Sequence, residues 1–117
     1  MANEFDIPIF KKAYDAYKMF YVFRATVPKQ DKYTLWAKSE GLLIEILEGI
    51  LSASYKQKFE KTPILERTSL KLNVLRVLIR LMKDVKAIDN KKYSALEEII
   101  DEMGRMLGGW LRSVNPI

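Results

Sequence analysis

Hydrophobic residues recur at helical spacing in four long segments of this 117-residue chain, and this periodicity most constrains how it can fold. Residues three and four apart lie on the same face of a helix, so each segment predicts one amphipathic helix. No segment alternates apolar and polar residues for long enough to predict a strand. The predicted helices span residues 8–24, 32–58, 63–86 and 90–112.

Proline and capping residues indicate where these helices begin. Proline is favoured at the first helical position, which places Pro8 and Pro63 at two helix starts. Short oxygen-bearing side chains cap helix N-termini, because they accept hydrogen bonds from unpaired backbone N–H groups. The predicted N-caps of the second, third and fourth helices are Asp31, Thr62 and Asp89.

Each predicted helix has one apolar face that we assign to the core. In the first helix this face comprises Ile9, Phe10, Ala13, Tyr14, Tyr17, Phe20 and Tyr21. In the third helix it comprises Leu70, Val74, Val77, Leu78, Leu81 and Val85. Within the second helix, Gly41 and Gly49 weaken the helix and therefore predict close packing. Four amphipathic helices joined by short links predict one all-α domain over residues 1–117, an antiparallel up-down-up-down four-helix bundle.

The chain contains neither cysteine nor histidine. Disulfides, thiolate metal sites and nucleophiles activated by an imidazole are therefore excluded. We expect no catalytic residue, no metal site and no cofactor. Chemistry by carboxylates or lysine stays open in principle. Glu40, near the apolar face of the second helix, is expected to pair with a basic residue of another helix rather than to act as a catalyst.

Positive charge is concentrated in the second half of the chain. The formal net charge is +5, and residues 56–92 alone contain eleven Lys and Arg against four Asp and Glu. An excess of positive charge favours an acidic partner such as nucleic acid. At about 100° per residue, Arg76, Arg80 and Lys83 form one stripe along the third helix. Such a stripe either follows a phosphate backbone or is an ordinary solvated face.

Three further basic residues are candidate phosphate contacts. Arg67 and Lys71 fall within the sector assigned to the apolar face, so they either extend their stems to water or are covered by another subunit. Lys86 follows the stripe at the end of the third helix. The predicted nucleic-acid contacts are therefore Arg76, Arg80 and Lys83, followed by Arg67, Lys71 and Lys86.

Two features suggest contact with another subunit. Met19 and Val22 are apolar residues among the charged positions of the first helix, which indicates either an interface or scattered surface hydrophobes. Glycines inside a helix cost about 1 kcal/mol each relative to alanine. Either close approach of another helix or subunit offsets this cost, or the glycines permit a bend that seats Trp110. The predicted interface residues are Met19, Val22, Gly104, Gly108 and Gly109.

Three motifs resemble the accessory variability determinant proteins of diversity-generating retroelements. Residues 8–18 read PIFKKAYDAYK and resemble the family's first helix, while residues 27–35 read VPKQDKYTL and resemble its link into the second helix. Residues 104–110 read GRMLGGW and are similar to the family's ending. The chain departs from the family by having Lys32 where arginine is usual.

The resemblance implies a four-helix bundle that assembles into a homopentamer. It implies binding of RNA and RNA–DNA hybrid through basic faces, and association with the retroelement reverse transcriptase to support mutagenic cDNA synthesis. The alternative is a bundle of the wider family encoded in intervening sequences of rRNA genes, which interacts with structured RNA or protein and is unrelated to a retroelement. This chain has Val27 where that wider family usually has phenylalanine.

No segment contains the roughly eighteen apolar residues that a membrane-spanning helix needs. The first residues also lack the basic and apolar regions of a signal peptide. We therefore expect a cytoplasmic protein with no membrane partner.

Overall fold

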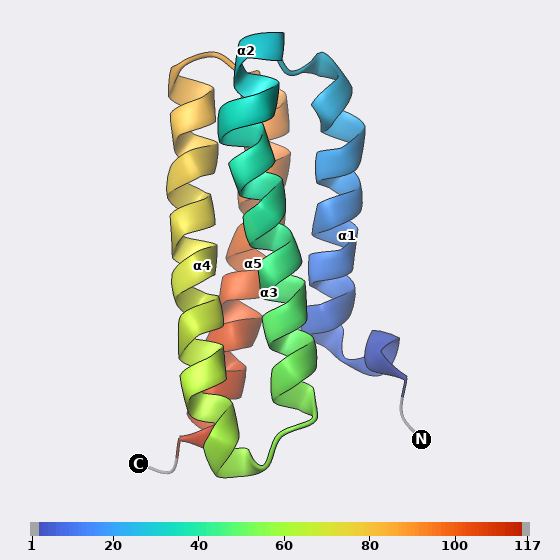
Figure 1. Cartoon of the computed structure of the whole chain (residues 1–117), viewed down its shortest axis with the longest axis vertical. Helices are drawn as coiled ribbons and strands as arrows, with labels where there is room; N and C mark the ends of the chain where they lie inside the picture. Colours follow the sequence, from blue (N-terminus) through green and yellow to red (C-terminus); the bar gives the residue numbers. More distant parts are fainter. Residues whose placement is uncertain (1–2, 116–117) are drawn as a thin grey trace.

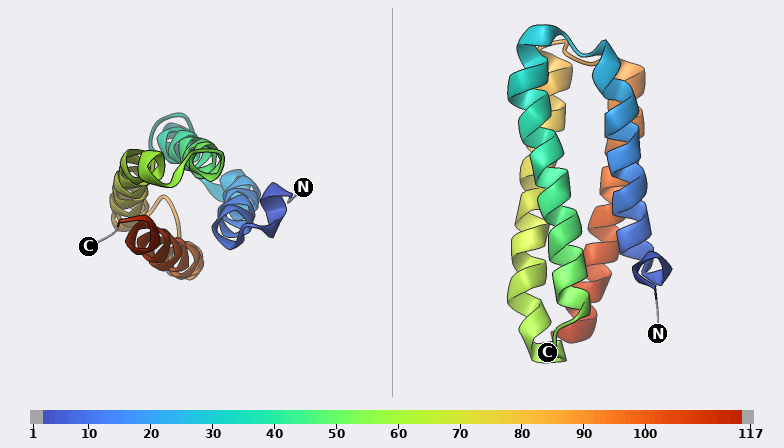
Figure 2. Two further views of the ribbon diagram at one scale, coloured as in Figure 1. Left: turned by 90° about the horizontal axis from the view of Figure 1, so that it is seen from below. Right: turned by 45° about the vertical axis from the view of Figure 1, so that its right-hand side comes forward.

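Four long helices form the bundle in a computed structural model that describes residues 3–115. They are α1 (Pro8–Phe23), α3 (Ala37–Ser54), α4 (Lys58–Asp84) and α5 (Asn90–Val114). Successive long helices run in opposite directions (Figure 1), and seen from the end they stand at four corners (Figure 2). Both α1 and α4 pack against α3 and α5. The predicted all-α, up-down-up-down bundle is confirmed.

The connection from α1 to α3 is more helical than its sequence predicts. A 3₁₀ turn (Arg24–Thr26) follows α1, and Pro28 then precedes the short helix α2 (Lys29–Asp31). A π-helical turn (Lys32–Trp36) joins α2 to α3. The predicted cap by Asp31 is wrong, because its backbone is already helical and its side chain makes no capping bond. The predicted end at 58 is also too late, since α3 ends at Ser54.

The start of α4 differs from the prediction that Thr62 caps a helix beginning at Pro63. The helix begins five residues earlier, at Lys58. Gln57 and Glu60 form a reciprocal capping box, in which each side chain accepts from the other's backbone N–H. This capping stabilises a start upstream of Pro63, which therefore lies inside the helix and cannot donate to the carbonyl four residues before it.

The face of α4 that enters the core is not the predicted one. Its buried residues are Leu65, Thr68, Leu72, Leu75, Ile79 and Met82. The residues assigned to the core from sequence are, except for the partly buried Leu78, exposed on the opposite side. Both sets have helical spacing, so α4 carries two apolar faces and the position of the bundle selects one of them.

The remaining ends follow the prediction more closely. α5 begins after Asp89, whose side chain accepts a hydrogen bond from the backbone N–H of Lys92, so this predicted cap is confirmed. α4 ends at Asp84, two residues before the predicted end. Lys86 has a φ of 65° in the α4–α5 turn, a left-handed conformation that ends the helix.

Close packing of α3 against α4 occurs at Gly49 but not at Gly41. A Cβ on Gly49 would overlap Oγ1 of Thr68, a buried residue of α4. A Cβ on Gly41 would meet nothing within 4 Å, so the prediction of close packing at that glycine is wrong. Gly49 thus lets the backbone of α3 approach α4.

Candidate nucleic-acid interface

The predicted stripe of α4 lies beside α5, where acidic groups already hold its arginines. Nε of Arg76 lies 3.3 Å from Oδ1 of Asp101 on α5, and its Nη1 donates to Asn73. Nε of Arg80 lies 3.2 Å from Oδ1 of Asp84. The hydrogen bond to Asp84 raises the pKa of Arg80. Arg80 is exposed, but Arg76 is only half-exposed, so the stripe is less available than its sequence predicts.

Lys83 completes the stripe through an aromatic contact. Its Nζ lies 4.6 Å from the centre of the Tyr93 ring, within the range of a cation–π interaction. The hydroxyl of Tyr93 donates to Glu97 at 2.6 Å, and this bond to a carboxylate raises the pKa of Tyr93. Lys83 is thereby held against α5.

The other three predicted contacts lie apart from the stripe. Lys71 faces α3, with its Nζ 3.1 Å from Oε1 of Glu45. Arg67 is exposed beside the same helix pair, and Lys86 is exposed in the α4–α5 turn. Neither Arg67 nor Lys86 forms an ion pair within residues 3–115. Their charges are therefore the most available of the six.

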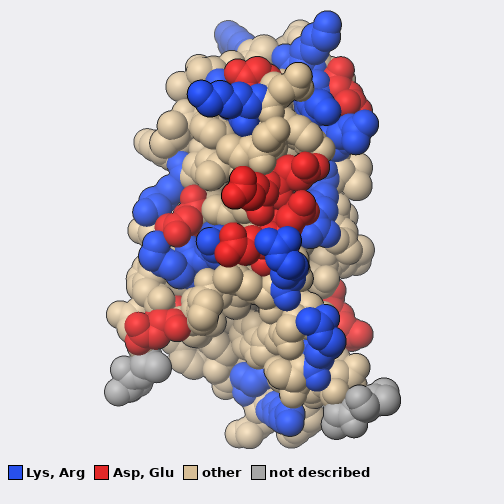
Figure 3. All heavy atoms as spheres, turned by 180° about the vertical axis from the view of Figure 1, so that it is seen from behind, with Lys and Arg blue, Asp and Glu red and all other residues tan. Residues whose placement is uncertain are grey.

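An acidic band crosses the face formed by α5, and it supplies the partner of Arg76 in the stripe. Figure 3 shows red side chains gathered at mid-height of this face, with blue side chains on both flanks. Within residues 3–115, two ion pairs join α5 to its neighbours: Asp101 to Arg76 of α4, and Glu102 to Lys12 of α1 at 3.2 Å. The middle of the bundle is therefore poorly suited to a polyanion on this side.

Positive charge gathers instead at one end of the bundle. The α1–α3 connection and the α4–α5 turn meet there, at the top of Figure 1. Residues 24–32 and 83–92 together contain seven basic and three acidic residues, which is +4 of the chain's net +5. We call this surface the basic end: Arg24, Lys29, Lys32, Lys83, Lys86, Lys91 and Lys92.

The two segments of the basic end adjoin across a shared hollow. Thr26 and Pro28 from one segment line it together with Lys83, Lys86 and Lys92 from the other. Lys92 is partly occupied, because its Nζ lies 3.3 Å from Oδ2 of Asp89. Sequence reasoning chose Lys83 and Lys86 as contacts and left out Lys91 and Lys92, which follow them in the same segment. It also missed Arg24, Lys29 and Lys32, because they lie about fifty residues earlier in the chain. The sequence feature that could have indicated this second segment is the pair of lysines after Pro28, Lys29 and Lys32.

A family model for bAvd-like proteins matches residues 8–114, from the first residue of α1 to the last residue of α5. The chain belongs to the bAvd-like family. This confirms the resemblance to accessory variability determinants drawn from the three motifs, and the family has an accessory, non-catalytic role. No curated protein matches the chain well enough to add a relative to this assignment.

The predicted interface residues of this bAvd-like chain have different surroundings. Met19 packs against the core, whereas Val22 is 67% exposed. Gly104 lies beneath the guanidinium of Arg76, so its close neighbour is a helix of the same chain. A Cβ on Gly108 or Gly109 would meet only Arg112 of the same helix. Their place in an oligomer stays a prediction.

Glu40 of the bAvd-like bundle has structural partners, as predicted. Its Oε1 lies 3.7 Å from Nε of Arg24, and the hydroxyl of Tyr17 donates to its Oε2 at 3.5 Å. Within residues 3–115, no three Asp or Glu side chains gather as metal ligands. No helix in this same range has both the length and the hydropathy to cross a membrane.

Proposed function

We propose that this bAvd-like chain is a non-enzymatic, nucleic-acid-binding accessory subunit of a diversity-generating retroelement. It holds RNA and RNA–DNA hybrid near the reverse transcriptase and so supports mutagenic cDNA synthesis in the cytoplasm. The family match over residues 8–114 carries the proposal. The concentration of positive charge at the basic end supports it independently.

The physical basis is the release of counterions from a polyanion. Each phosphate that a Lys or Arg neutralises frees condensed cations, so affinity falls steeply with salt. Contacts to phosphate position a protein without reading sequence, and binding should therefore have little base preference. In the proposed homopentamer, five protomers of +5 have a combined charge of +25.

Within this function, the basic end is the main contact and the α4 stripe is secondary. Lys86 and Arg67 reach phosphate without leaving an ion pair. Three other predicted contacts already pair with a carboxylate: Arg76, Arg80 and Lys71. Each has to share or exchange that partner to bind phosphate, which reduces its contribution to the affinity for RNA. Lys83 belongs to both the stripe and the basic end.

The test compares two charge reversals of equal size. One variant carries Lys29→Glu, Lys86→Glu and Lys91→Glu at the basic end. The matched control carries Lys56→Glu, Lys58→Glu and Arg105→Glu, which are exposed elsewhere. Each reversal removes two units of charge, so both variants fall from +5 to −1. RNA binding is measured by fluorescence anisotropy over a series of salt concentrations.

We expect the basic-end variant to lose at least tenfold more affinity than the control. Equal losses would show that only net charge matters, and would remove the basic end as the contact. A wild-type chain that binds no RNA or hybrid at low salt would refute nucleic-acid binding altogether.

Association with the reverse transcriptase is tested separately, by co-purification of the two proteins expressed together. A reverse transcriptase gene and paired template and variable repeats beside this gene are expected. Their absence would favour the alternative module that binds structured RNA or protein outside a retroelement.

A further inference from the structure

An exposed aromatic ring lies beside the lysines of the basic end. Tyr33 belongs to the π-helical turn between α2 and α3, and it is 67% exposed. Trp36 of the same turn is fully buried and packs on Phe20 of α1, with their ring centres 4.5 Å apart. The turn is therefore anchored in the core by Trp36, while Tyr33 projects to the surface.

The ring of Tyr33 has no aromatic or cationic partner within residues 3–115. The aromatic pairs and cation–π contacts of this range involve other rings. One of those rings is Tyr93, which already has Nζ of Lys83 over it at 4.6 Å. Tyr33 therefore offers an aromatic face that the protein itself does not use.

The groups around this ring suit an unpaired nucleotide. Pro28, Lys29 and Gln30 line an open hollow together with Tyr33, and all four are exposed. Lys29 forms no ion pair in the described part of the chain. The side-chain amide of Gln30 both donates and accepts hydrogen bonds, so it can pair with the edge of any base. An aromatic face, an amide and a positive charge are the groups with which proteins bind single-stranded nucleic acid.

This hollow adjoins the lysine-lined hollow of the basic end, because Pro28 lines both. Lys83, Lys86 and Lys92 line the second hollow. A nucleotide whose phosphate lies among these lysines would extend its base across Pro28 toward Tyr33. The two hollows together therefore match the phosphate and the base of one strand.

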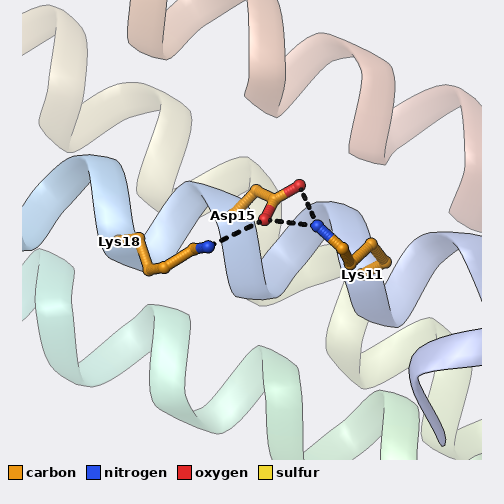
Figure 4. A network of polar contacts seen from close by, with 3 residues as sticks. All are labelled: Lys11, Asp15 and Lys18. Atoms are coloured by element: carbon orange, nitrogen blue, oxygen red, sulfur yellow. Dashed lines mark hydrogen bonds and ion pairs between the residues drawn. The ribbon is translucent and has the colours of Figure 1, made fainter.

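The tyrosines of α1 lack this combination of a free ring and free charge. Tyr14 and Tyr21 line an apolar groove between α1 and α3, beside Lys18. Oδ1 of Asp15 lies 3.5 Å from Nζ of Lys18 and 2.8 Å from Nζ of Lys11 (Figure 4). Nζ of Lys18 also lies 5.1 Å from the centre of the Tyr14 ring. Because these charges and this ring already have partners, the groove is poorly suited to a polyanion.

We propose that Tyr33 stacks on an unpaired base of single-stranded RNA or cDNA bound at the basic end. The inference rests on the proposed function, and it names the form of nucleic acid that this surface takes. Inside a duplex or an RNA–DNA hybrid, neighbouring bases cover both faces of each base, so only phosphate contacts remain. Tyr33 therefore contributes to the affinity for single strands and not to the affinity for the hybrid. Stacking tolerates every base because each base has a π-face.

Three substitutions separate stacking from charge. Tyr33→Ala removes the ring and leaves every charge in place, whereas Tyr33→Phe keeps the ring. The matched control is Tyr55→Ala, since Tyr55 is 76% exposed and directly follows α3. That end of α3 lies opposite the basic end (Figure 1). Circular dichroism confirms that each variant is folded.

Fluorescence anisotropy measures the affinity of each variant for matched probes. The probes are a single-stranded RNA, the DNA strand of the same sequence, an RNA–DNA hybrid of that sequence, and a strand whose bases are replaced by abasic sites. The abasic strand keeps the phosphates and lacks anything that could stack. Each affinity is measured over a series of salt concentrations.

We expect Tyr33→Ala to weaken binding of the two intact single strands by about tenfold, the loss typical when one stacked base loses its aromatic partner. Its affinities for the hybrid and for the abasic strand should equal those of the wild type. Tyr33→Phe and Tyr55→Ala should bind every probe as the wild type does. The slope of log affinity against log salt concentration should stay unchanged in Tyr33→Ala, because no phosphate contact is lost.

Two results would overturn the inference while leaving phosphate binding intact. If Tyr33→Ala binds single strands as tightly as Tyr55→Ala does, no base stacks on this ring. If it loses as much affinity for the hybrid and the abasic strand, the ring supports phosphate contacts instead of stacking. A loss confined to RNA or to DNA would support stacking and assign the ring to that strand. A wild-type chain that binds none of the probes at low salt would remove the proposed function itself, and the inference with it.

Discussion

The guanidinium of Arg76 lies directly over Gly104, in the space that a Cβ would fill. This contact joins α4 to α5 beside the ion pair between Arg76 and Asp101. It accounts for one glycine in α5 by a neighbour within the same chain. The distinction matters because Gly104 was predicted from sequence as a subunit contact.

Replacing Gly104 with alanine should change the free energy of unfolding by less than about 1 kcal/mol. The substitution gains about 1 kcal/mol of helix propensity. It also displaces Arg76, whose exposed ion pair contributes about 0–1 kcal/mol. Urea unfolding measures the difference. A loss above 2 kcal/mol, or a change in oligomer mass, would instead indicate tight packing or a subunit contact at this position.

Gly49→Ala should destabilise the bundle by about 1–2 kcal/mol. The new methyl would overlap the buried side chain of Thr68, whose hydroxyl donates to the carbonyl of Ile64. Gly41→Ala is the matched control, expected to stabilise by up to about 1 kcal/mol because its methyl meets nothing. In a Thr68→Ala background the cost of Gly49→Ala should fall, because Oγ1 is gone and only the Cβ of residue 68, at 3.3 Å, remains. An undiminished cost would contradict this contact.

The two apolar faces of α4 should differ sharply in their contribution to stability. Leu75→Ala on the core face should cost about 2–5 kcal/mol, since Leu75 is fully buried. Val77→Ala on the exposed apolar face should cost under about 0.5 kcal/mol, because Val77 is 66% exposed. Chemical unfolding at low protein concentration tests both. Equal costs would mean that the buried face has been assigned wrongly.

Asp89 should contribute stability that depends on pH. Its hydrogen bond from the backbone N–H of Lys92 lowers its pKa below the ordinary 3.8. A lowered pKa in the folded state means that the contribution is complete above about pH 4, and is lost as pH falls through the folded-state pKa. Asp89→Asn keeps a capping oxygen but no charge. Its unfolding midpoint should therefore fall less steeply between pH 5 and 2, and parallel curves would contradict this role.

Neutralising the α4 stripe should weaken RNA binding less than reversing the basic end. Arg76→Gln, Arg80→Gln and Lys83→Gln remove charges that are already held by Asp101, Asp84 and Tyr93. A lysine or arginine that contacts a phosphate of single-stranded RNA freely contributes roughly 0.7 to the slope of log affinity against log salt concentration. Each of the three substitutions should flatten this slope by less than that amount. An unchanged affinity and slope would remove the stripe from the interface, and a larger loss would make it primary.

Local signals in this chain predicted only some local features. Asp89 caps its helix as expected because a cap depends only on the residues that immediately follow it. Thr62 failed because a competing capping box, Gln57 with Glu60, lies upstream and Pro63 is tolerated inside the helix. The two possible starts of α4, Lys58 and Pro63, are only five residues apart, and the sequence does not show which of them the helix uses.

The candidate interface was predictable only in part. Lys83 and Lys86 belong to a basic stretch that is visible along the chain, but Arg24, Lys29 and Lys32 join them only because two turns meet at one end of the bundle. The partners of Arg76 and Lys71 lie on other helices. Whether a charge is available to a polyanion therefore depends on contacts that spacing does not reveal.

The sequence by itself determined four amphipathic helices in antiparallel order, because helical period and short connections are properties of neighbouring residues. Only the tertiary structure decided which face of α4 is buried, since Leu75 and Val77 belong to faces of the same period and similar hydrophobicity. The placement of α3 and α5 covers one face and leaves the other exposed. Burial is set by what lies opposite a side chain, and that neighbour comes from elsewhere in the chain.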